Sequence, residues 1–283
     1  MNISARGLAA AWLALASFIA SSAAGQEGNQ PAEPFRIADN LYYVGSSDIG
    51  SYLITTSAGH ILIDAGYVST VPIIESSVAK LGFKVADIRI LLNTQGHGDH
   101  AGGFAAMKKL TGATLMVSAA DADLIERGGA RDFSLGDTLT YPAATVDRRL
   151  KDGDTVSLGA TTLTAHLTPG HTKGCTTWTF DAHDRGRTLH VVDLCGLAIL
   201  ENTRVRGMPG YPDIAKDYER TFATLKKLPV DIFIGAHASY YGGMEKAAKA
   251  KANPAAPNPF IDPEGFRRMV DSAERRFREQ LAR

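Results

Sequence analysis

The chain has 283 residues, of which 45% are hydrophobic, so it can bury a substantial core, and we expect one large domain rather than two modest ones. Thirty Lys and Arg residues balance thirty Asp and Glu residues. This balance argues against nucleic acid or an anionic membrane surface as a partner.

The first residues have the pattern of an export signal. Arg6 precedes an apolar run over residues 8–20, which is too short to span a membrane, and residues 22–24 are the small residues that a signal peptidase reads. We predict a signal peptide at residues 1–24, a flexible lead-in at residues 25–34 and one domain at residues 35–283. The mature chain is expected in a bacterial periplasm, as a monomer without stable membrane association.

Hydrophobic periodicity predicts strands and helices that alternate through the first half of the domain. The expected strands are residues 41–44, 52–55, 60–64, 88–92 and 114–117, and the expected helices are residues 71–81, 104–110 and 120–127. Residues 137–168 carry turn signals and β character. Apolar residues recur at intervals of three and four over residues 214–225 and 266–281, which predicts two more helices. The order of elements is typical of an α/β fold.

Residues 93–100 read Asn-Thr-Gln-Gly-His-Gly-Asp-His, and they place His97, Asp99 and His100 directly after an expected strand. Nitrogen donors beside a carboxylate suit zinc better than magnesium or calcium, which take mostly oxygen ligands. The glycines between these residues permit a tight loop. The alternative interpretation is a solvated polar loop, but the spacing and context favour a metal site.

Two distant histidines follow strand-like segments in the same way. His171 lies in a Pro-Gly turn after the segment at residues 162–167, and His237 comes just after the apolar run at residues 232–234. Three strand ends would therefore each deliver ligands to one place.

With these histidines, the chain resembles the metallo-beta-lactamase hydrolases, whose signature is His-x-His-x-Asp-His followed by two later histidines. Gln95 stands where the first histidine of that signature is expected. The segments at residues 169–178, 207–212 and 256–260 resemble the third subclass of the class B beta-lactamases, and the likeness runs from about Phe35 to the C-terminus. The resemblance implies a four-layer αββα sandwich with the metal ligands along one edge.

The same resemblance implies two zinc sites. Gln95, His97 and His171 would surround the first zinc, and Asp99, His100 and His237 would hold the second. An amide oxygen is a weaker zinc donor than an imidazole, so the first zinc is expected to bind less tightly. Asp99 is also expected to orient the attacking water.

The activity implied by the resemblance is that of a secreted, zinc-dependent beta-lactamase. A metal-bound hydroxide would open the amide bond of a small beta-lactam substrate and so confer antibiotic resistance. One alternative is an exported hydrolase of the same fold that acts on a lactone or a thioester. Another is a non-catalytic zinc protein in which Gln95 marks decay of the site.

Cys175 and Cys195 are the two cysteines of the chain, and in an oxidising compartment they can pair. A hairpin that turns around Arg185 would set them opposite each other, so we predict a disulfide, with two free thiols as the alternative. The same register favours a structural, hydrogen-bonding role for Asp193 over a metal-bridging one.

Overall fold

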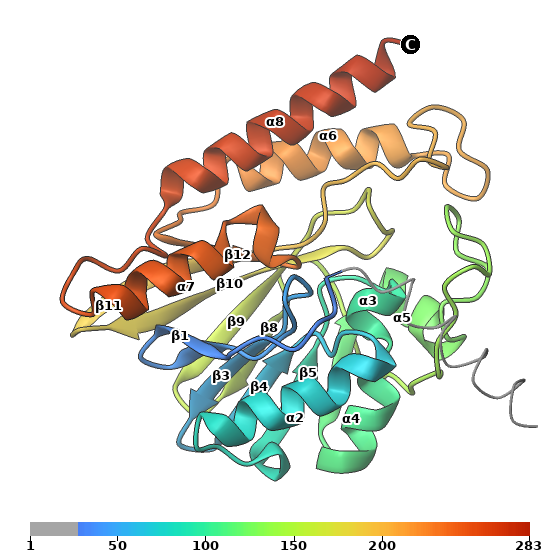
Figure 1. Cartoon of the computed structure of the whole chain (residues 1–283). Helices are drawn as coiled ribbons and strands as arrows, with labels where there is room; N and C mark the ends of the chain where they lie inside the picture. Colours follow the sequence, from blue (N-terminus) through green and yellow to red (C-terminus); the bar gives the residue numbers. More distant parts are fainter. Residues whose placement is uncertain (1–27) are drawn as a thin grey trace, which may run out of the picture.

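Two β-sheets lie face to face between outer layers of helices in the computed structural model, which describes residues 28–283 (Figure 1). The helices α6 and α8 cover one side, and α2 and α4 cover the other. The four-layer αββα sandwich expected from the resemblance is confirmed. The predicted signal peptide at residues 1–24 lies outside the described residues.

The first sheet of the described part of the chain has seven strands in the order of the sequence. The strands are β1 (Phe35–Ala38), β2 (Leu41–Tyr43), β3 (Tyr52–Thr56), β4 (Gly59–Ile63), β5 (Ile88–Leu92), β6 (Thr114–Ser118) and β7 (Arg148–Leu150). β1 to β4 pair antiparallel and β4 to β7 pair parallel. The parallel pairs require crossovers, which contain α2 (Val71–Lys80), α4 (Phe104–Thr111), α5 (Ala119–Glu126) and the 3₁₀ turns η1 (Val68–Thr70) and η2 (Val85–Asp87).

The second sheet has the order β12-β11-β10-β9-β8. Its strands are β8 (Thr155–Leu158), β9 (Thr161–Leu167), β10 (Thr176–Asp184), β11 (Arg187–Leu194) and β12 (Ile232–Gly235). The parallel pair of β11 and β12 is joined through α6 (Ile214–Leu225), and η3 (Ala238–Tyr240), α7 (Gly243–Ala252) and α8 (Pro263–Leu281) follow. The β character predicted for residues 137–168 is confirmed only from β7 onward.

Adjacent side chains in the first sheet enter two different cores. Leu53, Leu62 and Leu91 pack with residues of α2, α4 and α5. Ile54 and Ile63 face the second sheet and belong to the larger core. Because both faces of these strands are buried, their sequences are continuous apolar runs rather than alternating ones. Each fully buried Leu or Ile stabilises the fold by roughly 1.5–3 kcal/mol.

The helices α6 and α8 lie side by side on the second sheet (Figure 1). Tyr218 of α6 packs against Phe277 of α8 with ring centroids 5.3 Å apart. The predicted apolar stripes are confirmed, since their buried residues are Ile214, Tyr218, Phe222 and Leu225 in α6 and Phe266, Val270, Ala273 and Phe277 in α8. The stripes bury one side of each helix against the core.

The hairpin of β10 and β11 has a register that differs by one residue from the prediction. The prediction centred the turn on Arg185, whereas Asp184 pairs with Arg187 in the structure. The turn therefore consists of Arg185 and Gly186, whose φ angles are 50° and 76°. Two positive φ angles define the two-residue turn that suits the twist of a hairpin.

This shift leaves Cys175 and Cys195 one position out of direct alignment. Both lie just beyond the ladder, because β10 begins at Thr176 and β11 ends at Leu194. Their Cα atoms are nevertheless 5.9 Å apart and a disulfide joins them. The predicted disulfide is confirmed, and the alternative of two free thiols is wrong.

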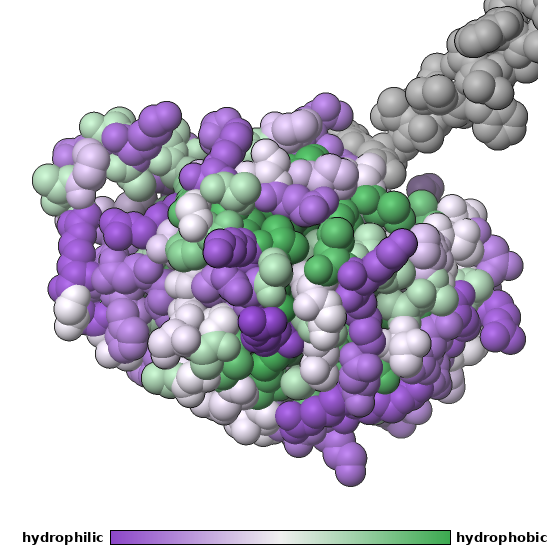
Figure 2. Space-filling view, turned by 90° about the horizontal axis from the view of Figure 1, so that it is seen from below, coloured by the Kyte–Doolittle hydropathy of each residue, from purple (hydrophilic) through white to green (hydrophobic). Residues whose placement is uncertain are grey.

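The first described residues contact the domain. The carbonyl oxygen of Gly28 accepts hydrogen bonds from the hydroxyl groups of Ser46 and Ser47 and from the backbone N–H of Asp48. Among residues 28–283, no helix combines the length and the hydrophobicity needed to cross a membrane. Seen from below, from the side of α2 and α4, hydrophobic residues gather in the middle of the face and hydrophilic residues surround them (Figure 2).

Candidate metal centre

The predicted metal-binding motif lies in the loop after β5 and in the short helix α3 (Gly98–Ala101). The carbonyl oxygen of Asn93 accepts a hydrogen bond from Nε1 of Trp178 at 3.1 Å, and that of Thr94 accepts one from the N–H of Thr176 at 2.7 Å. Both donors belong to β10, so the loop that follows a strand of one sheet is fixed by the other sheet.

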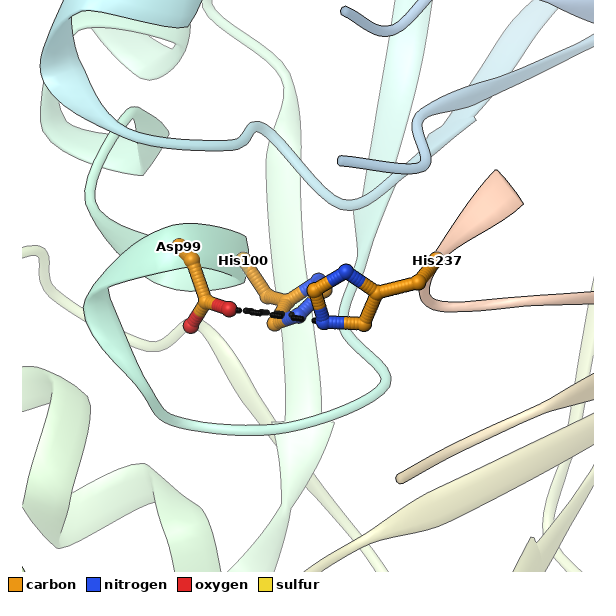
Figure 3. A group of neighbouring side chains, drawn as sticks. All are labelled: Asp99, His100 and His237. Atoms are coloured by element: carbon orange, nitrogen blue, oxygen red, sulfur yellow. Dashed lines mark ion pairs between the residues drawn. The ribbon is translucent and has the colours of Figure 1, made fainter. Parts of the chain in front are cut away.

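Asp99 and His100 from α3 meet His237 from the end of β12 (Figure 3). Oδ2 of Asp99 lies 3.2 Å from Nε2 of His100 and 3.6 Å from Nε2 of His237. The candidate ligand atoms of all three residues lie within 4.8 Å of one another. His100 is fully buried, whereas the side chains of Asp99 and His237 are 20% and 21% exposed. We call Asp99, His100 and His237 the second cluster, because they are the predicted ligands of the second zinc. The exposure of Asp99 and His237 shows that this cluster opens to solvent on one side.

A carboxylate orients each imidazole of the second cluster from behind. Oδ2 of Asp64 lies 3.2 Å from Nδ1 of His100, and Oδ2 of Asp48 lies 3.0 Å from Nδ1 of His237. Each histidine therefore turns its Nε2 toward Asp99, which is how carboxylates position histidines that bind metals. Burial lowers the pKa of His100, but Asp99 and Asp64 outweigh this effect and raise it to about 10, so a metal ion that binds Nε2 would have to displace a proton from it.

Sequence reasoning missed both orienting carboxylates. The strand predicted at residues 60–64 ends in Asp64, whereas β4 ends at Ile63 and Asp64 has a φ of 57°. Its position directly after an apolar strand, like that of the motif itself, is the signal that was available. Asp48 lies in a loop that is 189 residues from His237 in the sequence, and no sequence motif marks it.

His97 and His171 form the first cluster, with ring centroids 4.8 Å apart. Nδ1 of His171 lies 2.7 Å from the carbonyl oxygen of Ala198, so Nδ1 carries the proton and the lone pair is on Nε2. Burial and the neighbouring His97 lower the pKa of His171 to about 3. The imidazole is therefore neutral, as a metal ligand must be.

Space for His171 depends on Gly196. A Cβ atom at Gly196 would lie 2.6 Å from Cδ2 of His171, which is closer than van der Waals contact allows.

The other histidine of the first cluster, His97, has no hydrogen bond at Nε2 within the described part of the chain. The nearest carboxylate oxygen, Oδ2 of Asp132, lies 3.7 Å from this nitrogen, which is too long for a hydrogen bond.

Several predicted ligand atoms are buried without a hydrogen-bond partner. Within residues 28–283, such side-chain atoms belong to six residues, namely Ser51, His60, Gln95, His97, His100 and Asp193. Three of these residues are predicted ligands: Oε1 of Gln95 and Nε2 of His97 have no partner within hydrogen-bond distance, whereas Nε2 of His100 has the carboxylate of Asp99 at 3.2 Å as an ion pair. A buried polar atom without a partner costs about 1–3 kcal/mol, and a bound cation would remove that cost. These nitrogen and oxygen donors fit zinc.

Asp193 differs from its predicted hydrogen-bonding role. It is fully buried in β11, and neither carboxylate oxygen has a partner among the described residues. Burial and the nearby charge of Asp64 raise its pKa well above the usual value. Asp193 forms no side-chain hydrogen bond within residues 28–283, so its predicted hydrogen-bonding role is wrong.

Electrostatic interactions connect the two clusters. Burial raises the pKa of Asp99, but His100, His97 and His237 outweigh this effect and lower it. The pKa of His171 responds in turn to Asp99 and His100. Asp99 therefore interacts with each of the four predicted histidine ligands, and Gln95 is buried two residues before His97.

A buried group of imidazoles around a carboxylate, open on one side, is the arrangement of a metal-dependent enzyme. The family model of the metallo-beta-lactamase superfamily matches residues 48–237. The chain belongs to this superfamily, and the prediction that it is a hydrolase is confirmed.

Solved structures of similar proteins extend over nearly the whole chain. The FEZ-1 metallo-beta-lactamase from Legionella gormanii is 40% identical, with a TM-score of 0.86 over 89% of this chain and 97% of that one. BJP-1, a subclass B3 metallo-beta-lactamase of Bradyrhizobium japonicum, is 42% identical, with a TM-score of 0.84 over 92% and 97%. The class B3 di-zinc enzyme LRA-12 from an Alaskan soil metagenome is 36% identical, with a TM-score of 0.86 over 91% and 97%.

Proposed function

We propose that this protein is a zinc-dependent beta-lactamase that opens the amide bond of beta-lactam antibiotics and confers resistance to them. The observation that carries the proposal is the convergence of Asp99, His100 and His237 at a site that is open on one side. The subclass B3 beta-lactamases that resemble the chain, at 36% and 42% identity, support the same substrate class.

We assign Gln95, His97 and His171 to a first zinc, and Asp99, His100 and His237 to a second. Zinc with an open coordination position lowers the pKa of bound water to about 7 and polarises a carbonyl group. The orphaned Oε1 of Gln95 and Nε2 of His97 support this assignment. Because an amide oxygen is a weak donor, the first site should fill last.

We assign to Asp99 the orientation of the attacking water. Hydrolysis adds a hydroxyl group to the lactam carbonyl carbon, breaks the carbon–nitrogen bond and leaves a proton on the ring nitrogen. Asp99 is partly exposed and its Oδ2 lies between His100 and His237, so it can accept a hydrogen bond from the attacking water. During hydrolysis, Asp48 and Asp64 hold the imidazoles of His237 and His100 in place.

The test compares four substrates with zinc supplied: a carbapenem, a penicillin, an acyl-homoserine lactone and a thioester. We expect turnover of at least one lactam, and a loss of about 10²–10⁴ in kcat for Asp99→Asn. The control is Asp147→Asn, which removes a carboxylate that accepts hydrogen bonds from Lys108 and Leu115 in another part of the molecule.

Absence of lactam turnover would overturn the proposal. Turnover of the lactone or thioester alone would identify a different hydrolase of the same fold, because the metal motif does not encode the acyl group. Normal zinc binding without any hydrolysis would indicate a decayed site.

We also propose that residues 1–24 are a signal peptide, that residues 35–283 form the domain, and that the mature protein is a periplasmic monomer. The basic residue Arg6, the apolar run at residues 8–20 and the small residues at positions 22–24 support the signal peptide. N-terminal sequencing of the exported protein should begin near Gly25, and light scattering should give the mass of one chain. A cytoplasmic, uncleaved product or a dimer would contradict it.

A further inference from the structure

Asp121 is a buried carboxylate outside both clusters that bonds to two separate loops of the site. It lies in the first turn of α5 and is 1% exposed. Oδ2 accepts hydrogen bonds from the N–H of Gly96 at 2.8 Å and from the hydroxyl of Thr172 at 2.6 Å. Oδ1 accepts one from the N–H of Gly174 at 2.8 Å. Burial raises the pKa of Asp121, and these donors oppose that shift.

The donors flank the residues assigned to the first zinc. Gly96 lies between Gln95 and His97, and Thr172 directly follows His171. Gly96 and Thr172 are therefore joined through Oδ2 of Asp121, although their loops follow strands of different sheets, β5 and β9. Within residues 28–283, the structure gives no comparable bond from Asp121 to the second cluster, where Asp48 and Asp64 do the orienting.

The backbone of both loops approaches α5 closely. A Cβ atom at Gly174 would lie 2.1 Å from Oγ of Ser118, and one at Gly96 would lie 2.9 Å from Leu124. The hydroxyl of Tyr141 also donates to the carbonyl oxygen of Gly96. The peptide groups of Gly96 are thus held on the N–H side by Asp121 and on the carbonyl side by Tyr141.

We propose that Asp121 is a positioning residue that sets the separation of the Gln95–His97 loop from the His171 loop, and thereby the zinc affinity of the first site alone. This inference rests on the proposed assignment of those residues to zinc. Charge-assisted hydrogen bonds are among the stronger ones, and partners that orient metal ligands typically change metal affinity 10–100-fold when they are removed.

The experiment isolates the first site in a His237→Ala background, which removes a ligand of the second site. Asp121→Asn keeps the shape of the side chain but replaces one acceptor oxygen by an NH₂ group. We expect it to raise the zinc Kd of the first site about 10–100-fold in a chelator competition titration. The visible spectrum of the cobalt-loaded protein should shift as well, because the ligand geometry changes.

Matched variants separate positioning from general stability. Thr172→Val removes one donor at constant shape and should weaken the first site in the same direction, whereas Thr172→Ser restores the hydroxyl and the affinity. Asp147→Asn should leave the Kd unchanged, since it lies outside the site. In a His171→Ala background, which reports the second site, Asp121→Asn should have no effect on the Kd.

An unchanged Kd in folded Asp121→Asn, or equal weakening of both sites, overturns the inference. If that variant does not fold, the comparison of Thr172→Val with Thr172→Ser decides, and equal affinities overturn it. If the wild type binds no zinc, the proposed function fails first. Amide exchange at Gly96 and Gly174 in the metal-free protein then shows whether Asp121 joins the loops, and exchange that does not respond to Asp121→Asn would exclude that role too.

Discussion

Oδ2 of Asp64 lies 3.2 Å from Nδ1 of His100, and Asp64 reaches this position with a backbone φ of 57°. Only a few per cent of residues other than glycine adopt a positive φ, and such residues cluster at functional sites. Oδ1 of Asp64 also accepts a hydrogen bond from the N–H of Thr94 at 2.8 Å. One carboxylate thus ties the end of β4 both to the motif loop and to a proposed ligand.

Asp64→Asn should weaken the second zinc site about 10–100-fold, because an amide cannot replace all the acceptors that orient His100. Asparagine tolerates a positive φ, so backbone strain does not explain a loss. Zinc titration in a His171→Ala background measures the effect. An unchanged Kd would mean that Asp64 does not orient His100.

Gln95→His should tighten the first zinc site by roughly tenfold, about 1.4 kcal/mol of binding free energy, because imidazole is the better zinc donor. Zinc stoichiometry at limiting metal measures the change. Gln95→Ala should weaken zinc binding at the first site. Two equally tight zinc ions in the wild type would refute the idea that Gln95 weakens the site.

Gly196→Ala should displace the ring of His171, since the added Cβ would lie 2.6 Å from Cδ2. We expect a first-site zinc Kd raised about tenfold and a stability loss of about 1–3 kcal/mol from overpacking. The second site serves as the internal control. Wild-type affinity at both sites would show that the ring has room to move.

Replacing Cys175 and Cys195 together by serine should cost about 2–4 kcal/mol of unfolding free energy, since the bond closes a loop of sequence separation 20. Urea unfolding measures the loss. The matched control is the wild type under reducing conditions, which should lose a similar amount. Reactive thiols in the unreduced, denatured wild type would contradict the disulfide.

Asp262 caps α8 by accepting a hydrogen bond from the N–H of Gly265 at 2.8 Å. Burial raises its pKa, but the bonds from Lys246 and Gly265 outweigh this effect and lower it below 3.8. Asp262→Ala should therefore cost about 0.5–2 kcal/mol at neutral pH.

A lowered carboxyl pKa stabilises the fold above the unfolded value of 3.8, and this contribution disappears as the pH falls through the folded value. Unfolding experiments should therefore show the difference between wild type and Asp262→Ala shrinking below pH 3.8. Asp213→Ala is the control, because the side chain of Asp213 makes no capping bond to α6. A difference that does not depend on pH would contradict the pKa argument.

Local hydrophobic periodicity was sufficient to predict the bounds of an element where one face of that element meets the core. The helix predicted at residues 214–225 has those bounds in the structure, because its apolar residues recur at helical intervals. The predicted register of the β10–β11 hairpin differs by one residue from the observed register. The turn of Arg185 and Gly186 has no hydrophobic pattern that marks its centre. Asp193 could not be assigned from sequence either, because its surroundings come from other strands.

The chain's own residue pattern specified the donor types, their place after strands and the alternation of strands and helices, because hydrophobic spacing and ligand chemistry are local properties. The two-sheet architecture was implied by the family resemblance. Packing of the sheets decided which carboxylate supports which part of the site: Asp48, Asp64 and Asp121 belong to no metal-binding motif in the sequence, and they reach their partners over 189, 36 and as many as 53 positions. Such pairings depend on how distant segments approach one another in space, which no local pattern encodes.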